Sequence, residues 1–340
     1  MKKILITGGA GFIGINAAEH FIKKGWFVYI FDNFSRDLVQ ENINWLNNLY
    51  HGKFELIKGD VLTDQKKLLK LVEKVNLVIH LAAQVAVTSS VEDPNFDLKN
   101  NLIGTFNVLE TIRSSKNKPP IIFSSTNKVY GNLEQLKIVE KKQRYDFKDK
   151  HGVSENTNLD FHSPYGCSKG AADQYVRDYN RIYGLKTVVL RQSCIYGPHQ
   201  FGVEDQGWVA WFTIATLLNK KITIYGNGKQ VRDILYVDDL IRAYDLIFKN
   251  INKTAGKIYN VGGGYNNSLS LLEFMDCLEK NLNKKIKFSF ADWRPGDQPI
   301  FISDNASLIK DTGWQPTTNK EQGIRKITEW IKDNINLIRK

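Results

Sequence analysis

Two side chains that can exchange protons lie four residues apart in the stretch SPYGCSKGAADQY (163–175). Tyr165 and Lys169 would share one face of a helix, because residues four apart are neighbours on a helix surface. A nearby ammonium group lowers the pKa of a phenol, so Tyr165 could exchange a proton with a substrate hydroxyl. A Tyr-x-x-x-Lys pair is common on helices, however, and on its own it indicates only ordinary structure.

A run of hydroxyl side chains ends the apolar segment PIIFSST (120–126). Thr126 stands at the predicted end of a strand, where it could hydrogen-bond the same substrate oxygen as Tyr165. No Asp or Glu follows it, because the next two residues are Asn127 and Lys128. A reaction at this point would therefore use a hydroxyl group and do without a neighbouring acid.

A glycine-rich turn, TGGAGFIG (7–14), follows the first apolar run and precedes a helical pattern. In such a turn Gly8 permits a tight bend, Gly11 lets a pyrophosphate approach the backbone, and Gly14 lets helix and strand pack closely. The helix N-terminus, with Phe12 and Ile13 in its first turn, would then face the phosphates. The pattern predicts a dinucleotide cofactor.

Asp32 ends the next apolar run. An acid at this place accepts hydrogen bonds from the adenosine ribose and repels a 2′-phosphate, so the residue favours NAD over NADP as the cofactor. The alternative is a structural aspartate. Arg36 could hold a 2′-phosphate, stack on adenine or be a solvated charge. Asp60 could bind the adenine amino group or cap a helix. Further positions expected near the cofactor are Asn33, Val61, Leu81, Ala82, Ala83, Gln84 and Asn101.

The elements that must position these residues follow a strand–helix alternation. Six apolar runs, at 3–7, 26–31, 54–58, 76–83, 120–125 and 186–191, read as buried parallel strands, and a seventh lies at 257–263. A helix is expected over about 95–115. The alternation predicts an α/β fold with a Rossmann-type doubly wound parallel sheet. We expect a cofactor domain of residues 1–195 and 231–263, and a smaller substrate lobe of 196–230 and 264–340. The long polar segment 132–162 is a candidate lid.

The amino-acid composition limits the kinds of molecule that this chain is expected to bind. The formal charge of +11 comes from scattered lysines without a long basic run, which favours small anionic substrates over nucleic acid. Three cysteines without metal-ligand spacing predict no metal site, no disulfide framework and a cytoplasmic location. No apolar stretch is long enough to cross a membrane, so no membrane partner is expected.

The glycine turn, Asp32, the SST segment and the Tyr165–Lys169 pair together resemble the extended short-chain dehydrogenase/reductase family, which contains nucleotide-sugar epimerases and dehydratases. The resemblance covers nearly the whole chain. It implies that Tyr165 is the acid/base, that Lys169 holds the nicotinamide ribose, and that Thr126 is the hydroxyl partner. It also implies a nucleotide-sugar site that includes Asn127, Cys194, Gln206, Thr223, Tyr225, Arg232, Arg294 and Asp297.

Within that site the resemblance implies different tasks. Arg232 and Arg294 would clamp the diphosphate, for which bidentate guanidinium groups are suited. Asp297 would lie near the nucleotide ribose, and Tyr225, with Thr223, beside the nucleobase. Turn and core roles remain alternatives for Asp297 and Tyr225, and helix capping for Gln206. Many relatives carry Asn where this chain has Cys194, so the sugar could be oriented differently.

The resemblance also bears on the reaction. The 4,6-dehydratases place an acidic pair after their threonine, and this chain has Asn127 and Lys128 there, which argues against dehydration. An epimerase needs no such acid. The segments 163–212 and SSTNKVYGNLEQ resemble a 2-epimerase subgroup, which implies NAD-dependent interconversion of CDP-paratose and CDP-tyvelose at C2, within lipopolysaccharide O-antigen synthesis. Alternatives are a UDP-hexose 4-epimerase, another nucleotide-sugar 2-epimerase and a redox-silent NAD-binding regulator. The family implies a homodimer or homotetramer.

Overall fold

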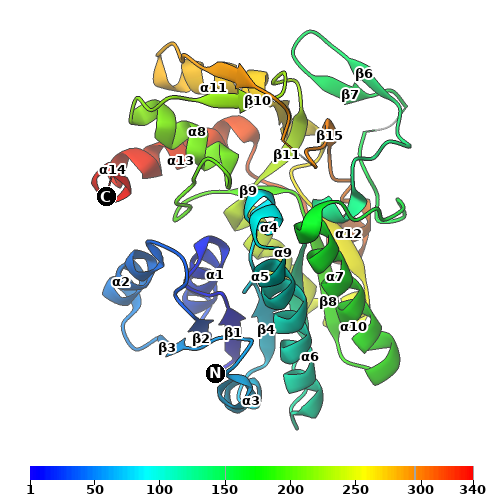
Figure 1. Cartoon of the computed structure of the whole chain (residues 1–340). Helices are drawn as coiled ribbons and strands as arrows, with labels where there is room; N and C mark the ends of the chain where they lie inside the picture. Colours follow the sequence, from blue (N-terminus) through cyan, green and yellow to red (C-terminus); the bar gives the residue numbers. More distant parts are fainter. Residues whose placement is uncertain (150, 295, 340) are drawn as a thin grey trace.

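The structure is a computed structural model that describes residues 1–149, 151–294 and 296–339. A parallel sheet of seven strands forms its centre, in the order β12-β8-β5-β4-β1-β2-β3 (Figure 1). The strands are β1 (Lys3–Thr7), β2 (Phe27–Asp32), β3 (Phe54–Lys58), β4 (Leu77–His80), β5 (Ile121–Thr126), β8 (Thr187–Gln192) and β12 (Ile258–Val261). They coincide with the seven apolar runs, which confirms the predicted Rossmann-type α/β fold.

Helices cover both faces of this sheet. One apolar core forms against α1 (Phe12–Lys23), α2 (Val39–Tyr50) and α9 (Val237–Lys249), and the other against α3 (Gln65–Val72), α6 (Gly104–Ser114) and α7 (Ser163–Tyr183). The short helix α10 (Ile251–Thr254) follows α9, and α12 (Ala306–Thr312) packs beside β12. Six of the strands are almost entirely buried, which explains their continuous apolar runs. The edge strand β3 was expected to be buried as well, but it is largely exposed, because no strand pairs with its outer edge.

The helix expected over about 95–115 is confirmed, because residues 94–114 are helical without a break, but a π-helical turn lies in its middle. After α4 (Val87–Glu92), the chain forms α5 (Pro94–Leu98), a π-helical turn η1 (Lys99–Ile103) and then α6. Apolar periodicity does not reveal this change, because a π turn widens the helix without ending it. The widened turn holds Asn101, a residue that the sequence assigns to the cofactor site.

A second lobe lies at the carboxyl edge of the sheet (Figure 1). Its elements are β9 (Cys194–Tyr196), α8 (Trp208–Leu217), β10 (Thr223–Tyr225), β11 (Val231–Tyr236), η3 (Tyr265–Asn267), β13 (Ser268–Ser270), α11 (Leu271–Leu282), β14 (Ser289–Ala291), β15 (Ile300–Phe301), α13 (Lys320–Asp333) and α14 (Ile335–Ile338). Strand β11 pairs with β9, β13 and β15. It therefore belongs to the smaller sheet, although the sequence analysis grouped residues from 231 with the cofactor domain.

The segment 132–162, a candidate lid, carries structure of its own. It contains the antiparallel strands β6 (Ile138–Glu140) and β7 (Tyr145–Phe147), and follows the 3-10 turn η2 (Asn127–Tyr130). Leu133, Phe147 and Val153 are buried in a small core with the strand β15. These contacts anchor the described part of the segment, and Lys150 lies outside the described residues.

Candidate active site

The predicted site residues gather at one edge of the large sheet. Strands β1, β2, β4, β5 and β8 are parallel, so their carboxyl ends meet there. The chain runs from β1 outward to β2 and β3, and then crosses back to β4 on the other side of β1. Ligands of open α/β sheets bind at such a switch point.

The glycine turn fits a pyrophosphate. Gly8 has φ +68°, and a Cβ there would lie 2.7 Å from the Ala82 nitrogen, while a Cβ on Gly14 would lie 2.4 Å from the Gly8 oxygen. At Gly11 a Cβ would meet only the Gly8 oxygen, at 3.3 Å. Gly8 and Gly14 thus serve packing, whereas Gly11 leaves its backbone approachable. The first turn of α1, with Phe12 and Ile13, contains no acidic residue, so its positive end can face an anion.

Asp32 stands at the end of β2 and holds the turn in place. Its carboxylate accepts hydrogen bonds from the Ala10 nitrogen at 3.0 Å and the Phe34 nitrogen at 2.9 Å. Burial raises its pKa, and these two bonds oppose the shift. Asp60 accepts hydrogen bonds from the Asn33 amide group and the Leu62 nitrogen, which joins the loops after β2 and β3. The cap of α3 is Asp64 rather than Asp60.

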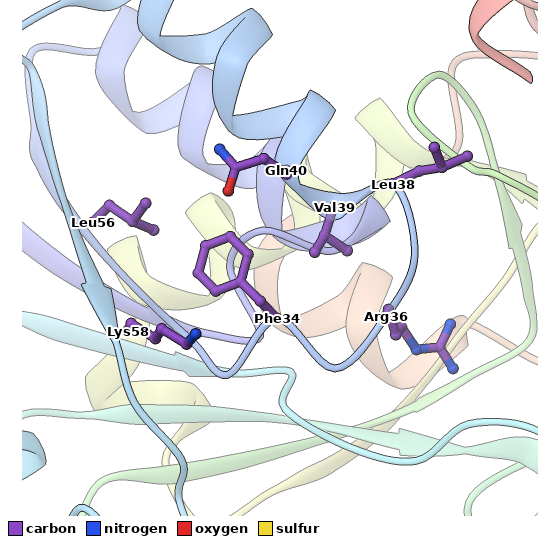
Figure 2. A pocket seen from close by; sticks show the side chains of 7 residues that line it. All are labelled: Phe34, Arg36, Leu38, Val39, Gln40, Leu56 and Lys58. Atoms are coloured by element: carbon purple, nitrogen blue, oxygen red, sulfur yellow. The ribbon is translucent and has the colours of Figure 1, made fainter. Parts of the chain in front are cut away.

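A pocket of about 410 Å³ lies beside the loop after β2 (Figure 2). Phe34 and Val39 line it from the loop and α2, and Leu56 and Lys58 line it from the edge strand β3. The guanidinium group of Arg36 points away from Lys58 and donates to the Gln206 side-chain oxygen at 2.6 Å. Of the roles that the sequence left open for Arg36, none anticipated this contact with the second lobe.

Thr126 and Tyr165, the predicted catalytic hydroxyl groups, lie within hydrogen-bond reach of each other. Thr126 ends β5 and Tyr165 lies in the first turns of α7, which Pro164 opens. Burial raises the pKa of Tyr165 to about 12, and a hydrogen bond with Thr126 acts in the opposite direction. The Thr126 hydroxyl oxygen also accepts from the Lys128 nitrogen at 3.2 Å. The two hydroxyl groups therefore form the pair that the sequence predicts, free of any carboxylate at positions 127 and 128.

Lys169 lies one turn further along α7, and its side chain is buried. Its amine donates to the Ser124 carbonyl oxygen at 2.5 Å and lies 4.4 Å from the centre of the Phe123 ring. Burial lowers the pKa of Lys169 to about 7, and the carboxylates of Asp97 and Asp173 oppose this shift. The cation whose charge lowers the pKa of Tyr165 here is Arg36. Tuning of Tyr165 by Lys169 stays a prediction.

A buried polar network supports the loop after β4, which contains Leu81, Ala82, Ala83 and Gln84. The Asn101 side chain is fully buried, accepts from the Gln84 nitrogen at 2.8 Å, and donates to Asp97 and Ser168. Asn101 therefore positions the loop instead of facing an open site. Val61 is buried in the core against Gly104.

In the second lobe, Arg232 and Asp297 form an ion pair of 2.6 Å. The Lys128 amine lies 3.6 Å from the same Asp297 oxygen and donates to the Gly296 carbonyl at 3.2 Å. Burial lowers the pKa of Lys128, and Asp297 opposes the shift. Asp297 thus makes a charged cluster with two cations, and Cys194 lies close enough for both to affect its thiol.

A second cluster surrounds Arg294. Its guanidinium group lies 3.9 Å from the centre of the Tyr225 ring, pairs with Asp205 at 2.9 Å, and donates to the Glu204 carbonyl. The Tyr225 hydroxyl donates to the Glu204 carboxylate at 3.1 Å. Arg294 and Tyr225, which the sequence assigns to the diphosphate and the nucleobase, are therefore in contact, and Asp205 and the Glu204 carbonyl hold the arginine.

Three other predicted substrate residues occupy distinct positions. Cys194 opens β9 and accepts a hydrogen bond from the Trp208 ring nitrogen at 3.3 Å. Asn127 is buried, with its side-chain oxygen 3.4 Å from the Thr126 hydroxyl. Thr223 opens β10 and pairs with Ser289 of β14.

Sequence reasoning assigned no binding role to Lys128, Glu204 or Asp205. For Lys128 the signal was its place two residues after Thr126. The two acids lie in the run VEDQ (203–206), within the segment 163–212 that resembles the 2-epimerase subgroup. Among the residues that the structure describes, no group of three His, Cys, Asp or Glu side chains could hold a metal ion, and no helix is long and apolar enough to span a membrane.

Comparisons with known proteins agree with this geometry. The model of the family described as GDP-mannose 4,6 dehydratase matches residues 5–327. The chain is 45% identical, over 96% of its length and 98% of the relative, to CDP-paratose 2-epimerase from Salmonella typhi. It also superposes on UDP-glucuronic acid 4-epimerase from Bacillus cereus, solved with UDP-glucuronic acid and NAD, at a TM-score of 0.84 and 28% identity, covering 97% of this chain and 99% of that one.

A third similarity is to UDP-glucose 4-epimerase from Thermotoga maritima, solved with UDP-glucose, at a TM-score of 0.83 and 30% identity, covering 98% of this chain and 99% of that one. All three relatives are nucleotide-sugar epimerases. The match of the family model over most of the chain, together with these relatives, shows that this chain belongs to the GDP-mannose 4,6-dehydratase family of extended short-chain dehydrogenases/reductases.

Proposed function

We propose that this chain is an NAD-dependent epimerase that interconverts CDP-paratose and CDP-tyvelose at C2 through a transient 2-keto sugar. The observation that carries the proposal is the pair of Thr126 and Tyr165 at the carboxyl edge of the sheet, with no acid at positions 127 and 128. The 45% identity to the Salmonella CDP-paratose 2-epimerase supports this choice of substrate.

Residues of this chain fit the cofactor. Gly11 and the first turn of α1 would hold the pyrophosphate, Asp32 the adenosine ribose, and Lys169 the nicotinamide ribose. NAD, when bound, supplies a reversible acceptor for the hydride of a sugar carbon. Tyr165 would take the hydroxyl proton during oxidation and return it afterwards, while Thr126 orients the same oxygen.

The second lobe would hold the nucleotide. Arg232 and Arg294 carry the guanidinium groups suited to a diphosphate, Asp297 lies beside Arg232, and Tyr225 stacks on Arg294 near Thr223. Since Glu204 and Asp205 hold Arg294 in this structure, an arriving diphosphate would compete with them for the same guanidinium group.

The test is direct. The purified protein is incubated with CDP-paratose and NAD, and the products are followed by proton NMR. Appearance of the C2 epimer supports the proposal, and an unchanged sugar contradicts it. A parallel incubation with UDP-glucose tests the alternative 4-epimerase, which the likeness to the Thermotoga enzyme favours. UDP-galactose without any CDP-tyvelose would assign the chain to that reaction.

We further infer a homo-oligomer that acts in a reducing compartment such as the cytoplasm. Large apolar side chains with 38–65% exposure lie along α4 to α7, namely Val91, Phe96, Leu98, Ile103, Phe106, Tyr175, Ile182 and Tyr183. A patch of this kind marks a protein interface, which supports the homo-oligomer. All three cysteines are free thiols, which supports the reducing compartment. Light scattering after gel filtration should give a dimer or larger species, and Phe106→Asp should shift it toward the monomer.

A further inference from the structure

Lys128 places a cation between the reaction centre and the diphosphate arginines. Its backbone nitrogen donates to the Thr126 hydroxyl at 3.2 Å, so the residue is fixed beside the catalytic oxygen. Its amine reaches across to the second lobe, where it donates to the Gly296 carbonyl and lies 3.6 Å from Asp297. The Lys128 side chain is mostly buried and retains 19% exposure.

The charges around this amine do not cancel. Arg232 already pairs with Asp297 at 2.6 Å, which is closer than Lys128. One carboxylate therefore faces two cations, and the cluster carries one positive charge in excess. A buried excess charge is costly unless a counterion arrives. A phosphate group of the substrate would supply that counterion.

The chemistry of a C2 reaction explains why a cation stands so close to Thr126. In a nucleotide sugar, C1 bears the phosphate, and C2 is bonded directly to C1, whereas C4 lies across the ring. When C2 is presented to Thr126 and Tyr165, the sugar-linked phosphate must come near the reaction centre. When C4 is presented, the same phosphate lies further away. A cation two residues after Thr126 matches the first arrangement.

We propose that Lys128 binds the sugar-linked phosphate of the nucleotide sugar and thereby presents C2, rather than C4, to Thr126 and Tyr165. This inference rests on the proposed CDP-sugar specificity. Lys128 is a specificity-determining residue here, and Arg232 and Arg294 take the remaining charge of the diphosphate. Lys128, which stands where the dehydratases carry an acid, would thus bind a phosphate group instead.

A purely structural role of Lys128 predicts different binding results from a role in phosphate binding. If Lys128 only neutralised Asp297, its loss would act through that carboxylate, and removing the carboxylate charge would reverse the effect. If it binds phosphate, its loss should weaken ligands that carry the second phosphate and leave others unchanged. CDP carries the phosphate that is bonded to the sugar in the substrate, and CMP lacks it, so the two nucleotides separate the cases.

The experiment measures binding of CDP and CMP by calorimetry to the NAD-loaded protein. For Lys128→Met we expect CDP to bind roughly 10–100-fold more weakly, the usual effect of losing a hydrogen bond to a charged group, with CMP affinity nearly unchanged. Lys128→Arg should restore part of the preference for CDP. Lys257→Met, which removes a lysine paired with Asp311 at 2.7 Å, is the matched control and should bind both nucleotides like the parent.

The double variant Lys128→Met/Asp297→Asn decides between the two roles. Continued loss of the CDP preference supports phosphate binding by Lys128, and its recovery would overturn the inference. Equal weakening of CDP and CMP in Lys128→Met would overturn it as well. The binding result does not depend on turnover, so a parent protein that binds CDP tightly but fails to epimerise CDP-paratose would refute the proposed function alone. NMR of the Lys128→Met products should show C2 epimerisation reduced relative to any C4 reaction.

Discussion

Arg36 and Gln206, which are 170 residues apart in sequence, are joined by a hydrogen bond of 2.6 Å between the guanidinium group and the amide oxygen. Arg36 belongs to the loop after β2, beside Asp32, which we propose binds the adenosine ribose, and Gln206 precedes α8 of the second lobe. The bond ties the loop after β2 to the segment 203–207, in which the Asp205 carboxylate and the Glu204 carbonyl hold Arg294. The loop after β2 and the second lobe therefore share a direct polar connection, and under the proposed function it would join the cofactor site to the substrate site.

This connection bears on cofactor choice, because it engages the arginine that could otherwise hold a 2′-phosphate. We expect NAD to bind roughly 100-fold more tightly than NADP, since Asp32 would face the added phosphate and like charges near a protein surface cost about 2–4 kcal/mol. Calorimetry with both cofactors measures the difference. Asp32→Asn should narrow the gap, and equal affinities in the parent protein would refute the role of Asp32.

Removing the phenol oxygen of Tyr165 should stop the chemistry and spare the cofactor. We expect Tyr165→Phe to lower kcat roughly 10²–10⁴-fold, the usual worth of a placed acid/base, with NAD affinity unchanged. Lys169→Ala should lower both kcat and NAD affinity, because the amine would also hold the nicotinamide ribose. Steady-state rates and NAD calorimetry on both variants check this, and normal turnover of Tyr165→Phe would move the reaction centre elsewhere.

Acid should destabilise the fold through His80. Its ring is buried between Thr7 at 2.6 Å and Thr105 at 3.0 Å, and Thr105 donates to the Asn101 carbonyl, so the neutral ring satisfies both neighbours. Burial lowers the pKa of His80 to about 3, below its usual 6.5. The unfolded chain then binds the extra proton between these values, and stability should fall by up to about 1.4 kcal/mol per pH unit as pH drops from 6.5 toward 3.

Urea titrations at several pH values measure this slope. His80→Gln should lower the overall stability but flatten the acid dependence. His51→Gln, at an exposed histidine on the surface, serves as the control and should keep the parent slope. An unchanged slope in His80→Gln would show that other groups dominate acid unfolding.

The protein should not dehydrate hexoses, because Asn127 and Lys128 stand where the 4,6-dehydratases carry the acidic pair that expels the C6 hydroxyl. Incubation with CDP-glucose or UDP-glucose and NAD should give no 4-keto-6-deoxy product by NMR. A known 4,6-dehydratase run on its own substrate under the same conditions controls for detection. Formation of the keto sugar by this protein would mean that an acid outside positions 127 and 128 performs the elimination.

The sheet, the glycine turn and the Tyr165–Lys169 pair were predictable because each is encoded locally, as an apolar run, a spacing or a helix period. The π turn at Asn101 was not, since it depends on how the helix packs against α7. The contact of Arg36 with Gln206 was not predictable either, because it joins loops of two lobes. The placement of β11 in the smaller sheet followed from pairing partners that are distant in sequence.

The last prediction concerns the carbon that is oxidised. Paratose lacks a C3 hydroxyl, so a ketone at C4 would acidify hydrogens at C3 and C5 and leave C2 unaffected. Proton removal at C2 therefore gains nothing from oxidation at C4. Direct oxidation at C2 is the simpler route: Tyr165 takes the hydroxyl proton, the carbon loses its hydride and becomes planar, and the hydride returns to the opposite face.

That route requires the sugar to turn between the two steps while its diphosphate stays bound. Arg232, Arg294 and Lys128 would keep hold of the phosphates, and the small side chain of Cys194 would leave room for the turn. CDP-paratose deuterated at C2 should therefore keep its label at C2 after epimerisation, and unlabelled substrate in heavy water should gain none there. Mass spectrometry and NMR of the product measure both. Loss of the label to solvent would exclude direct oxidation at C2 and would require a mechanism in which a base removes the C2 hydrogen as a proton.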